Sequence, residues 1–473
     1  MVIEKGSAKK AGLGYIIGNY FLRGIGFLTL PLFSRLLSSE DFGIYNTFLS
    51  YGNILFVFVG LALHTSYKSA QIKYDNGFEN YVSNTLVLCI VSSVIFLIGG
   101  ASIPFFFEGL SYEMVFWLIL YSFGTAITAY YNSYLSIYFK SASYIRLATI
   151  SAISNIVVSL VLIFSIFYEN RSMGRIIGTT LPVFVIALIW IIDFLKKWKP
   201  DLNSSQIKFA LRYSVPLIPH GISQVLLSSC DKVMIAMMVG NSQAGIYSFA
   251  YTIYSLISVT FSSLDQVWSP WFFQQMKENN IRKIREVADQ YALGIAIVAV
   301  MSMLAGPELI YIIGSNDFLE SKYLFVPVVV GGFFSFMYTF PAAIEYYYEK
   351  TKYIAIGTSF AAVINILLNF VGIRIFGYTI AAYTTLLTYL LYFLFHYCIS
   401  VSLTGGKSLY NIRNFAAICI FVCIGGIVTQ SLLNQMIIRW ILLLALVVVF
   451  IVYIFKIVNL PILSQIKRKL KFK

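Results

Sequence analysis

Residues 42–48 read FGIYNTF and residues 244–250 read AGIYSFA, so the triplet Gly-Ile-Tyr occurs twice, 202 residues apart. Each copy follows a long apolar run and a short polar turn, residues 38–41 in the first case and 240–243 in the second. Each copy therefore opens a new apolar segment. A similarity that recurs in the same context indicates an internal repeat of the fold.

The segments around this repeat are long enough to cross a membrane. A spanning helix needs about 20 mostly apolar residues. Fourteen runs meet this need, near residues 12–35, 43–64, 83–105, 114–138, 145–167, 174–195, 209–231, 244–266, 288–312, 323–344, 353–373, 377–401, 413–432 and 437–457. The connections between them are too short to hold a folded catalytic domain. The sequence predicts an all-α, polytopic membrane protein with about 14 transmembrane helices.

The composition agrees with this prediction. The chain is 59% hydrophobic and only 11% charged, whereas soluble domains carry about 25% charged residues. The net charge of +14 follows the positive-inside rule. With the N-terminus inside, 26 of the 34 lysines and arginines lie at cytoplasmic ends or loops. Both termini are therefore expected in the cytoplasm, and the basic tail is expected to meet membrane lipids and not nucleic acid.

The repeat also predicts how the helices are grouped. The offset between the two triplets corresponds to six runs, and six is even, so the two halves share one orientation. Such halves are related by an axis along the membrane normal. We expect a six-helix bundle in residues 1–200, a second in 201–404, and two additional helices with a basic tail in 405–473. A cavity is expected between the two bundles.

Motifs of soluble enzymes are missing from the sequence. The three histidines are scattered, no HExxH or GxxxxGK[ST] pattern occurs, and the five cysteines have no zinc or disulfide spacing. We therefore predict no catalytic residue, no metal site and no cofactor.

Ionisable and polar residues inside the apolar runs are the candidate functional groups. A charge within a membrane is costly and usually faces a cavity or a partner. The predicted cavity residues are Asn19, Arg23, Gln224, Asp231, Lys232 and Arg374. Asp231, Asp265 and Glu345 are also candidates to carry a coupling ion. Three structural roles are the alternatives for these residues. They are an ion pair that joins two helices, anchoring at the membrane interface, and a position at the solvated inner end of a span.

Proline residues mark candidate hinges. Pro216 and Pro219 lie in the seventh run, and Pro31 lies in the first. Proline removes a backbone hydrogen bond and bends a spanning helix. We expect the first and seventh helices to bend during alternating access.

Several of these stretches resemble a known family. Residues 31–45, PLFSRLLSSEDFGIY, look like the signature of bacterial polysaccharide flippases of the Wzx type. Residues 213–219, 230–235 and 268–271, which read YSVPLIP, CDKVMI and WSPW, are similar to the same family. The resemblance covers nearly the whole chain. It implies the multidrug/oligosaccharidyl-lipid/polysaccharide (MOP) exporter fold, in which two six-helix bundles are sometimes followed by two more helices.

The resemblance also implies a function. The family moves undecaprenyl-pyrophosphate-linked oligosaccharides to the outer leaflet of the bacterial inner membrane, for O-antigen, capsule or exopolysaccharide synthesis. The expected energy source is a proton or sodium gradient or the membrane potential. The expected state is a monomer that serves polymerase and chain-length proteins of the same pathway. Candidate cavity residues for this cargo are Asn19, Arg23, Asn53, Tyr130, Asn132, Asn155, Gln224, Tyr254, Asn365 and Asn369.

One departure bears on the substrate. Relatives that flip the peptidoglycan precursor carry several cavity arginines, whereas only Arg23 lies clearly within a run here. Two alternatives remain open. A cation-coupled multidrug exporter of the same superfamily would need deep acids in the first half. A membrane-embedded polymerase or glycosyltransferase would usually need a large outer loop.

Overall fold

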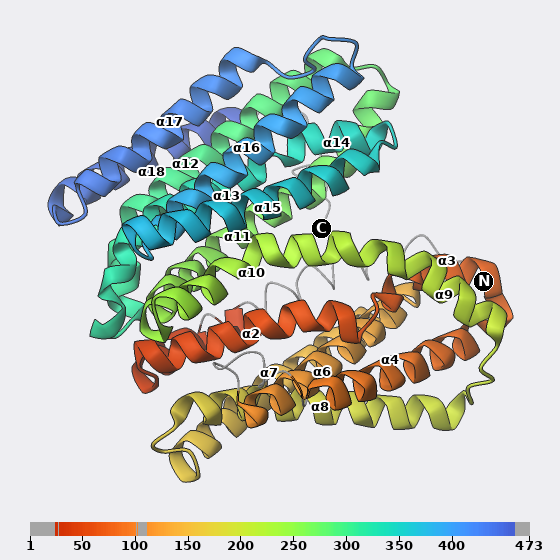
Figure 1. Ribbon diagram of the computed structural model, residues 1–473. Coiled ribbons are helices and arrows are strands. Elements are labelled where there is room, and N and C mark those ends of the chain that lie inside the picture. The colour runs from red at the N-terminus through yellow and green to blue at the C-terminus, as the bar shows by residue number, and fades with distance from the viewer. Residues whose placement is uncertain (1–23, 27, 101, 103–110, 459–473) are drawn as a thin grey trace, which may run out of the picture. The chain divides into compact units, whose positions relative to one another are not determined.

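The computed structural model describes residues 24–26, 28–100, 102 and 111–458, and the regular elements within these ranges are helices (Figure 1). Residues 24–26 and 28–36 are helical. The elements that follow in the first half are α2 (Ser39–Val59), η1 (Leu63–Ser66), α3 (Tyr67–Tyr74), η2 (Asp75–Gly77), α4 (Phe78–Gly100), α6 (Tyr112–Ile137), α7 (Ser141–Ser165) and α8 (Arg171–Lys197). The next are α9 (Ser204–Ser214), η3 (Val215–Leu217), α10 (Ile218–Met238), α11 (Asn241–Lys277), α12 (Ile281–Ile313), η4 (Asn316–Ser321), α13 (Lys322–Met337), α14 (Thr339–Tyr347), α15 (Thr351–Phe376), α16 (Ile380–Leu403), α17 (Ile412–Ser431) and α18 (Met436–Val458).

Twelve helical stretches of the described residues are long and apolar enough to cross a membrane. They match twelve of the fourteen predicted runs. The seventh run corresponds to α10, which carries more polar residues, and the first includes the apolar helix at Gly24–Leu36. The prediction of an all-α, multi-pass membrane protein is therefore confirmed.

The polar turn before the first Gly-Ile-Tyr triplet fixes the start of α2. The Ser38 hydroxyl accepts a hydrogen bond from the Asp41 backbone N–H at 3.1 Å, and the Asp41 carboxylate accepts one from the Ser38 N–H at 3.3 Å. This capping box satisfies two of the amides that a helix start leaves unpaired. Asp41 also accepts a bond from the backbone N–H of Ser172 at 3.1 Å, which ties α2 to the start of α8.

The two copies of the repeat lie against each other. A Cβ on Gly43 would overlap the carbonyl of Asn241, and a Cβ on Gly245 would overlap the carbonyl of Ser39. The Ser39 and Ser242 hydroxyls are 2.7 Å apart at the same crossing. Only glycine lets two helix backbones approach this closely. The predicted repeat is thus a packing motif that joins the starts of α2 and α11.

The chain divides into two compact units. The first comprises the described part of Met1–Ser248 with Thr358–Tyr378, and the second comprises Phe249–Gly357 with the described part of Thr379–Lys473. In the first unit α8 packs on α6 and α7, and α2 packs on α6 and α10. In the second, α12 packs on α13, α17 and α18, and α13 packs on α16 (Figure 1).

Aromatic side chains fill the core of the first unit. Tyr67 is fully buried and makes edge contacts with Phe78, Tyr81 and Tyr130. The Tyr130 hydroxyl donates a hydrogen bond to the carbonyl of Gly60 at 2.5 Å. Buried tyrosines need such a partner for their polar end. Tyr130, a predicted cavity residue, is therefore a core residue of this unit.

Candidate functional site

A buried carboxylate forms the centre of a polar cluster in the first unit. Asp231 of α10 is 3% exposed. Its carboxylate accepts a hydrogen bond from the Tyr247 hydroxyl at 2.6 Å and another from the Asn369 amide at 2.7 Å. The side-chain amide oxygen of Asn365 accepts hydrogen bonds from the Asn369 amide and from the Cys230 thiol, both at 3.1 Å. Asp231 is thus held by side chains from α11 and α15.

This cluster unites residues that the sequence suggested separately. Asp231, Asn365 and Asn369 were all predicted to face a polar cavity, and Tyr247 belongs to the second Gly-Ile-Tyr triplet. Lys232 is half-buried beside the cluster and interacts electrostatically with Asp231. A buried carboxylate with donors on both oxygens can bind a proton or a monovalent cation when its donors rearrange.

The second unit contains a cavity of about 280 Å³ that is lined by hydroxyls and one carboxylate. Asp265, half-buried on α11, faces this cavity. The other lining residues are Tyr254, Ser258, Phe261, Ser262, Gly332, Ser335, Phe336, Tyr338 and Thr339. The predicted residues Tyr254 and Asp265 therefore lie at one cavity.

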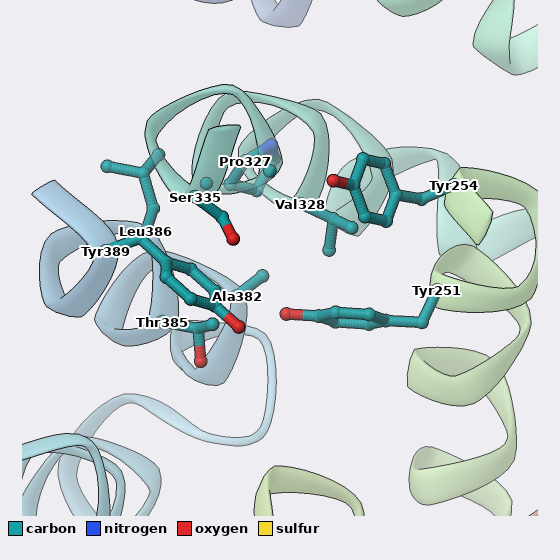
Figure 2. Close-up of a pocket in the computed structure, with 11 residues that line it drawn as sticks. Tyr251, Tyr254, Pro327, Val328, Ser335, Ala382, Thr385, Leu386 and Tyr389 are labelled. Atoms are coloured by element: carbon teal, nitrogen blue, oxygen red, sulfur yellow. The ribbon is translucent and has the colours of Figure 1, made fainter. Parts of the chain in front are cut away.

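A smaller hollow of about 80 Å³ shares Tyr254, Gly332 and Ser335 with the cavity. Figure 2 shows Tyr251 and Tyr254 extending into it from α11 and Tyr389 from α16. The hydroxyls of Tyr251 and Tyr389 point toward each other. The two hollows together form one region, which we call the tyrosine cavity. Its lining combines aromatic faces with hydroxyl groups, a composition suited to a polar ligand with some apolar surface.

Gly332 explains how Tyr254 reaches this position. A Cβ on Gly332 would overlap the Tyr254 hydroxyl. The glycine on α13 therefore leaves the space that the tyrosine ring of α11 occupies. The sequence offers only a weak signal for this pairing, because Gly331 and Gly332 form an ordinary glycine pair within an apolar run.

Glu345 pairs with a histidine that the sequence analysis did not single out. The Glu345 carboxylate lies 2.7 Å from Nδ1 of His396, and both side chains are completely buried. The pair joins α14 to α16 within the second unit. Glu345 was predicted to carry an ion, with a solvated position at the inner end of its span as the alternative. Its side chain is fully enclosed by protein.

The remaining predicted cavity residues lie apart from these sites. Gln224 is exposed on α10, and its amide donates to the Thr358 hydroxyl at 3.5 Å. Arg374 is exposed in the last turn of α15, with its guanidinium 3.9 Å from the centroid of the Phe370 ring. Asn19 and Arg23 lie outside the described residues.

Asn155 has a different role from the one expected. Its amide oxygen accepts a hydrogen bond from Arg175 at 2.6 Å, and Ser159 accepts one from the same guanidinium at 2.8 Å. The guanidinium lies 3.7 Å from the centroid of the Phe33 ring. The amide thus holds a cation within the first unit. Asn53 and Asn132, also predicted, are half-buried on α2 and α6.

Two of the three predicted hinge prolines coincide with a break in the helix. Pro216 lies in the short 3₁₀ turn η3, and Pro219 lies in the first turn of α10. Pro31 lies within the helical residues 28–36, and its carbonyl accepts a bond from the Ser34 hydroxyl at 3.2 Å. The hinge role of all three residues stays a prediction.

Sequence reasoning missed Tyr251, Ser335, Tyr389 and His396 as site residues. A signal for the tyrosines exists, because Tyr247, Tyr251 and Tyr254 recur at spacings of four and three residues and so share one helix face. Within the described residues, no group of three or more His, Cys, Asp and Glu side chains could hold a metal ion.

Comparison with known proteins places the chain in a family. The family model described as polysaccharide biosynthesis protein matches residues 9–276. A protein of the Lsg locus of Haemophilus influenzae is 23% identical over 365 residues, covering 72% of this chain and 85% of that protein. An uncharacterized membrane protein of the same organism is 23% identical over 353 residues, covering 72% and 84%.

Solved structures show the same fold. The lipid II flippase MurJ in an inward closed conformation matches with a TM-score of 0.68 at 15% identity, over 94% of this chain and 98% of that chain. An inward-facing multidrug resistance MATE family transporter of the MOP superfamily matches with a TM-score of 0.65 at 16% identity, over 82% and 96%. The chain therefore has the fold of MOP superfamily transporters and belongs to the family of polysaccharide biosynthesis proteins.

Proposed function

We propose that this protein is a flippase that moves undecaprenyl-pyrophosphate-linked oligosaccharide repeat units from the cytoplasmic to the outer leaflet by alternating access. The cargo would serve O-antigen, capsule or exopolysaccharide synthesis. Membership of the polysaccharide biosynthesis family supports a role in sugar polymer production. The MOP transporter fold supports a transport step over a catalytic one.

The tyrosine cavity is the observation that carries this proposal. An oligosaccharide leaving water needs partners for its hydroxyls, because unpaired polar groups are costly in an apolar medium. Ser258, Ser262, Ser335 and Asp265 supply such partners within the membrane-spanning part of the second unit. Tyrosine rings can cover the apolar faces of sugar rings. The lipid chain would stay in the bilayer.

Positively charged side chains would bind the pyrophosphate of the cargo. Lysine and arginine form short, charge-assisted bonds to phosphate oxygens. Arg23, Lys232 and Arg374 are the proposed groups for this contact. Transport would draw on a proton or sodium gradient or on the membrane potential, with Asp231, Asp265 and Glu345 as the proposed ion carriers. A cation-coupled multidrug exporter would use the same acids, so the test must identify the cargo.

Deleting the gene tests the cargo. We expect lipid-linked single repeat units to accumulate on the inner leaflet of the deletion strain, and wild-type protein to restore export. Units that reach the outer leaflet unpolymerised in the deletion strain would contradict the proposal and indicate a polymerase. An unchanged repeat-unit pool with altered drug sensitivity would indicate a drug exporter.

Variants of the tyrosine cavity refine this test. Tyr251→Ala and Tyr389→Ala each remove an aromatic face from the cavity, so we expect each to lower export about tenfold, the equivalent of about 1.4 kcal/mol. Tyr311→Ala removes a tyrosine that is 72% exposed on α12 and is the matched control. Equal export by all three variants, at equal protein levels, would show that the cavity does not bind cargo.

A further inference from the structure

The Glu345–His396 pair is unusual because each partner has a second polar atom with no hydrogen-bond partner among the described residues. The Oε1 atom of Glu345 lies 2.7 Å from Nδ1 of His396, whereas Oε2 of Glu345 and Nε2 of His396 are buried and find no partner in the part of the chain that the structure describes. Both side chains are 0% exposed. An unsatisfied buried polar atom is costly, so two of them in one pair call for an explanation.

The surroundings of the pair do not fix its charge. No lysine or arginine among the described residues makes an ion pair with either side chain. The neighbours of His396 are the rings of Tyr338, Tyr392 and Phe395, with centroids 5.5, 4.5 and 5.2 Å away. The titratable groups that interact with the pair or with its tyrosine neighbours are Asp265 of α11, Tyr338 before α14, Tyr346 of α14 and Tyr392 of α16.

We propose that Glu345 and His396 form a proton-binding site in the second unit. With one proton between Oε1 and Nδ1 and none on Nε2 or Oε2, the pair carries one negative charge. A second proton, taken from water, binds Nε2, so the loaded pair has no net charge and fits its apolar enclosure. Releasing this proton to water restores the negative pair. Nε2 is therefore the position at which the loaded and unloaded states differ.

Tyr338 links this site to the tyrosine cavity. Its side chain lines the cavity with Asp265, and its ring contacts His396. Tyr346 interacts electrostatically with both Asp265 and Glu345. Asp265, the carboxylate that faces the cavity, is thus a group from which the pair could receive a proton. Through Tyr338, a change of charge on the pair would alter the interactions of a ligand in the cavity.

Gly357 of α15 limits where the second proton can go. A Cβ on Gly357 would lie 2.6 Å from Nε2 of His396, so the helix backbone closely covers this atom. An N–H at Nε2 needs an acceptor, and a shift of α15 would admit one.

Proton binding at His396 can be followed directly. The chain has only three histidines, so the full-length protein with labelled histidine in nanodiscs gives three ring signals, assigned by substituting His64 and His220. We expect the His396 ring signal to report proton binding when the buffer pH is changed. Glu345→Gln should alter this response, because the neighbouring carboxylate is lost.

Glu286→Gln is the matched control, since Glu286 is another glutamate of the second unit but is exposed and pairs with Arg282. This control should leave the His396 response unchanged. A His396 signal that does not change with pH in wild-type protein would overturn the proposal. So would a response that Glu345→Gln does not alter, or one that Glu286→Gln alters equally.

The role of the pair in transport rests on the proposed flippase function and has its own readout. In cells that carry wild-type protein, export of lipid-linked repeat units should vary with external pH. Glu345→Gln should flatten this pH profile, whereas Glu286→Gln should keep its shape. Export that is absent with wild-type protein would contradict the flippase function. Normal export with an unchanged pH profile in Glu345→Gln would contradict only the proton site.

Discussion

At the scale of single residues, the two Gly-Ile-Tyr triplets use the same tyrosine in different ways. Tyr45 lies 3.1 Å from the hydroxyl of Thr179, a neutral partner. Tyr247 donates at 2.6 Å to the carboxylate of Asp231. Hydrogen bonds to charged groups contribute about 1.5–3 kcal/mol, compared with about 1 kcal/mol for neutral pairs. The tyrosine of the second triplet therefore supports a buried acid, whereas the tyrosine of the first triplet bonds to a neutral hydroxyl.

This difference predicts unequal effects of one substitution. Tyr247→Phe should lower the free energy of unfolding by about 2–3 kcal/mol, because it removes the hydrogen bond that Tyr247 donates to the Asp231 carboxylate. Tyr45→Phe should cost about 1 kcal/mol. Thermal unfolding of the two purified variants in one detergent measures the difference. Equal losses, or a larger loss for Tyr45→Phe, would mean that the Asp231 carboxylate is stabilised by other groups.

Residue types were easier to predict than residue pairs. Asp231, Asp265 and Glu345 stand out as acids within apolar runs, and the structure places all three at polar sites. The partner of Glu345 lies 51 residues away, in a different apolar run. Nothing in the local sequence selects His396 over the other histidines, because the pairing depends on how α14 and α16 pack.

At the scale of elements, the two C-terminal helices are attached by specific polar contacts. Arg439 of α18 donates to both oxygens of Glu308 on α12, at 2.6 and 2.7 Å, and to the Leu304 carbonyl at 2.9 Å. Arg439 is 3% exposed. Arg439 is therefore the anchor that attaches α18 to α12.

Breaking this pair should therefore loosen α18. Glu308→Gln leaves a buried guanidinium without its counter-charge, which costs about 3–5 kcal/mol. A double substitution, Glu308→Met with Arg439→Met, should recover most of this stability. The control is Glu286→Gln, because its partner Arg282 has a side chain that is 94% exposed, and such pairs contribute at most about 1 kcal/mol. Thermal unfolding compares the variants, and a loss in Glu308→Gln no larger than in the control would refute the anchoring role.

At the scale of the whole molecule, periodicity and length were sufficient to predict the helices. The fourteen apolar runs and the repeat led to the fold class, since a span of about 20 apolar residues has few alternatives to a membrane helix. The helix boundaries were less predictable. The seventh run begins at residue 209, whereas the structure breaks the chain at η3 and starts α10 at Ile218. The prolines signalled this break, and packing decided its position.

The lining of the tyrosine cavity could be predicted only in part from the sequence. Its lining comes from α11, α13, α16 and the residues that begin α14, segments far apart in the chain. Tyr254 and Asp265 were the two members that sequence reasoning found. The others carry no unusual chemistry on their own, and only the packing of the second unit assembles them into a polar hollow.

The central claim is that this protein moves a lipid-linked oligosaccharide across a membrane. The most direct test reconstitutes the purified full-length protein in vesicles that contain lipid-linked repeat units extracted from the deletion strain. An impermeant reagent that modifies only exposed sugars then reports which leaflet holds them. With an ion gradient, we predict that the inner-leaflet units become accessible in vesicles with the protein and stay protected in protein-free vesicles. Equal protection in both kinds of vesicle would contradict the account.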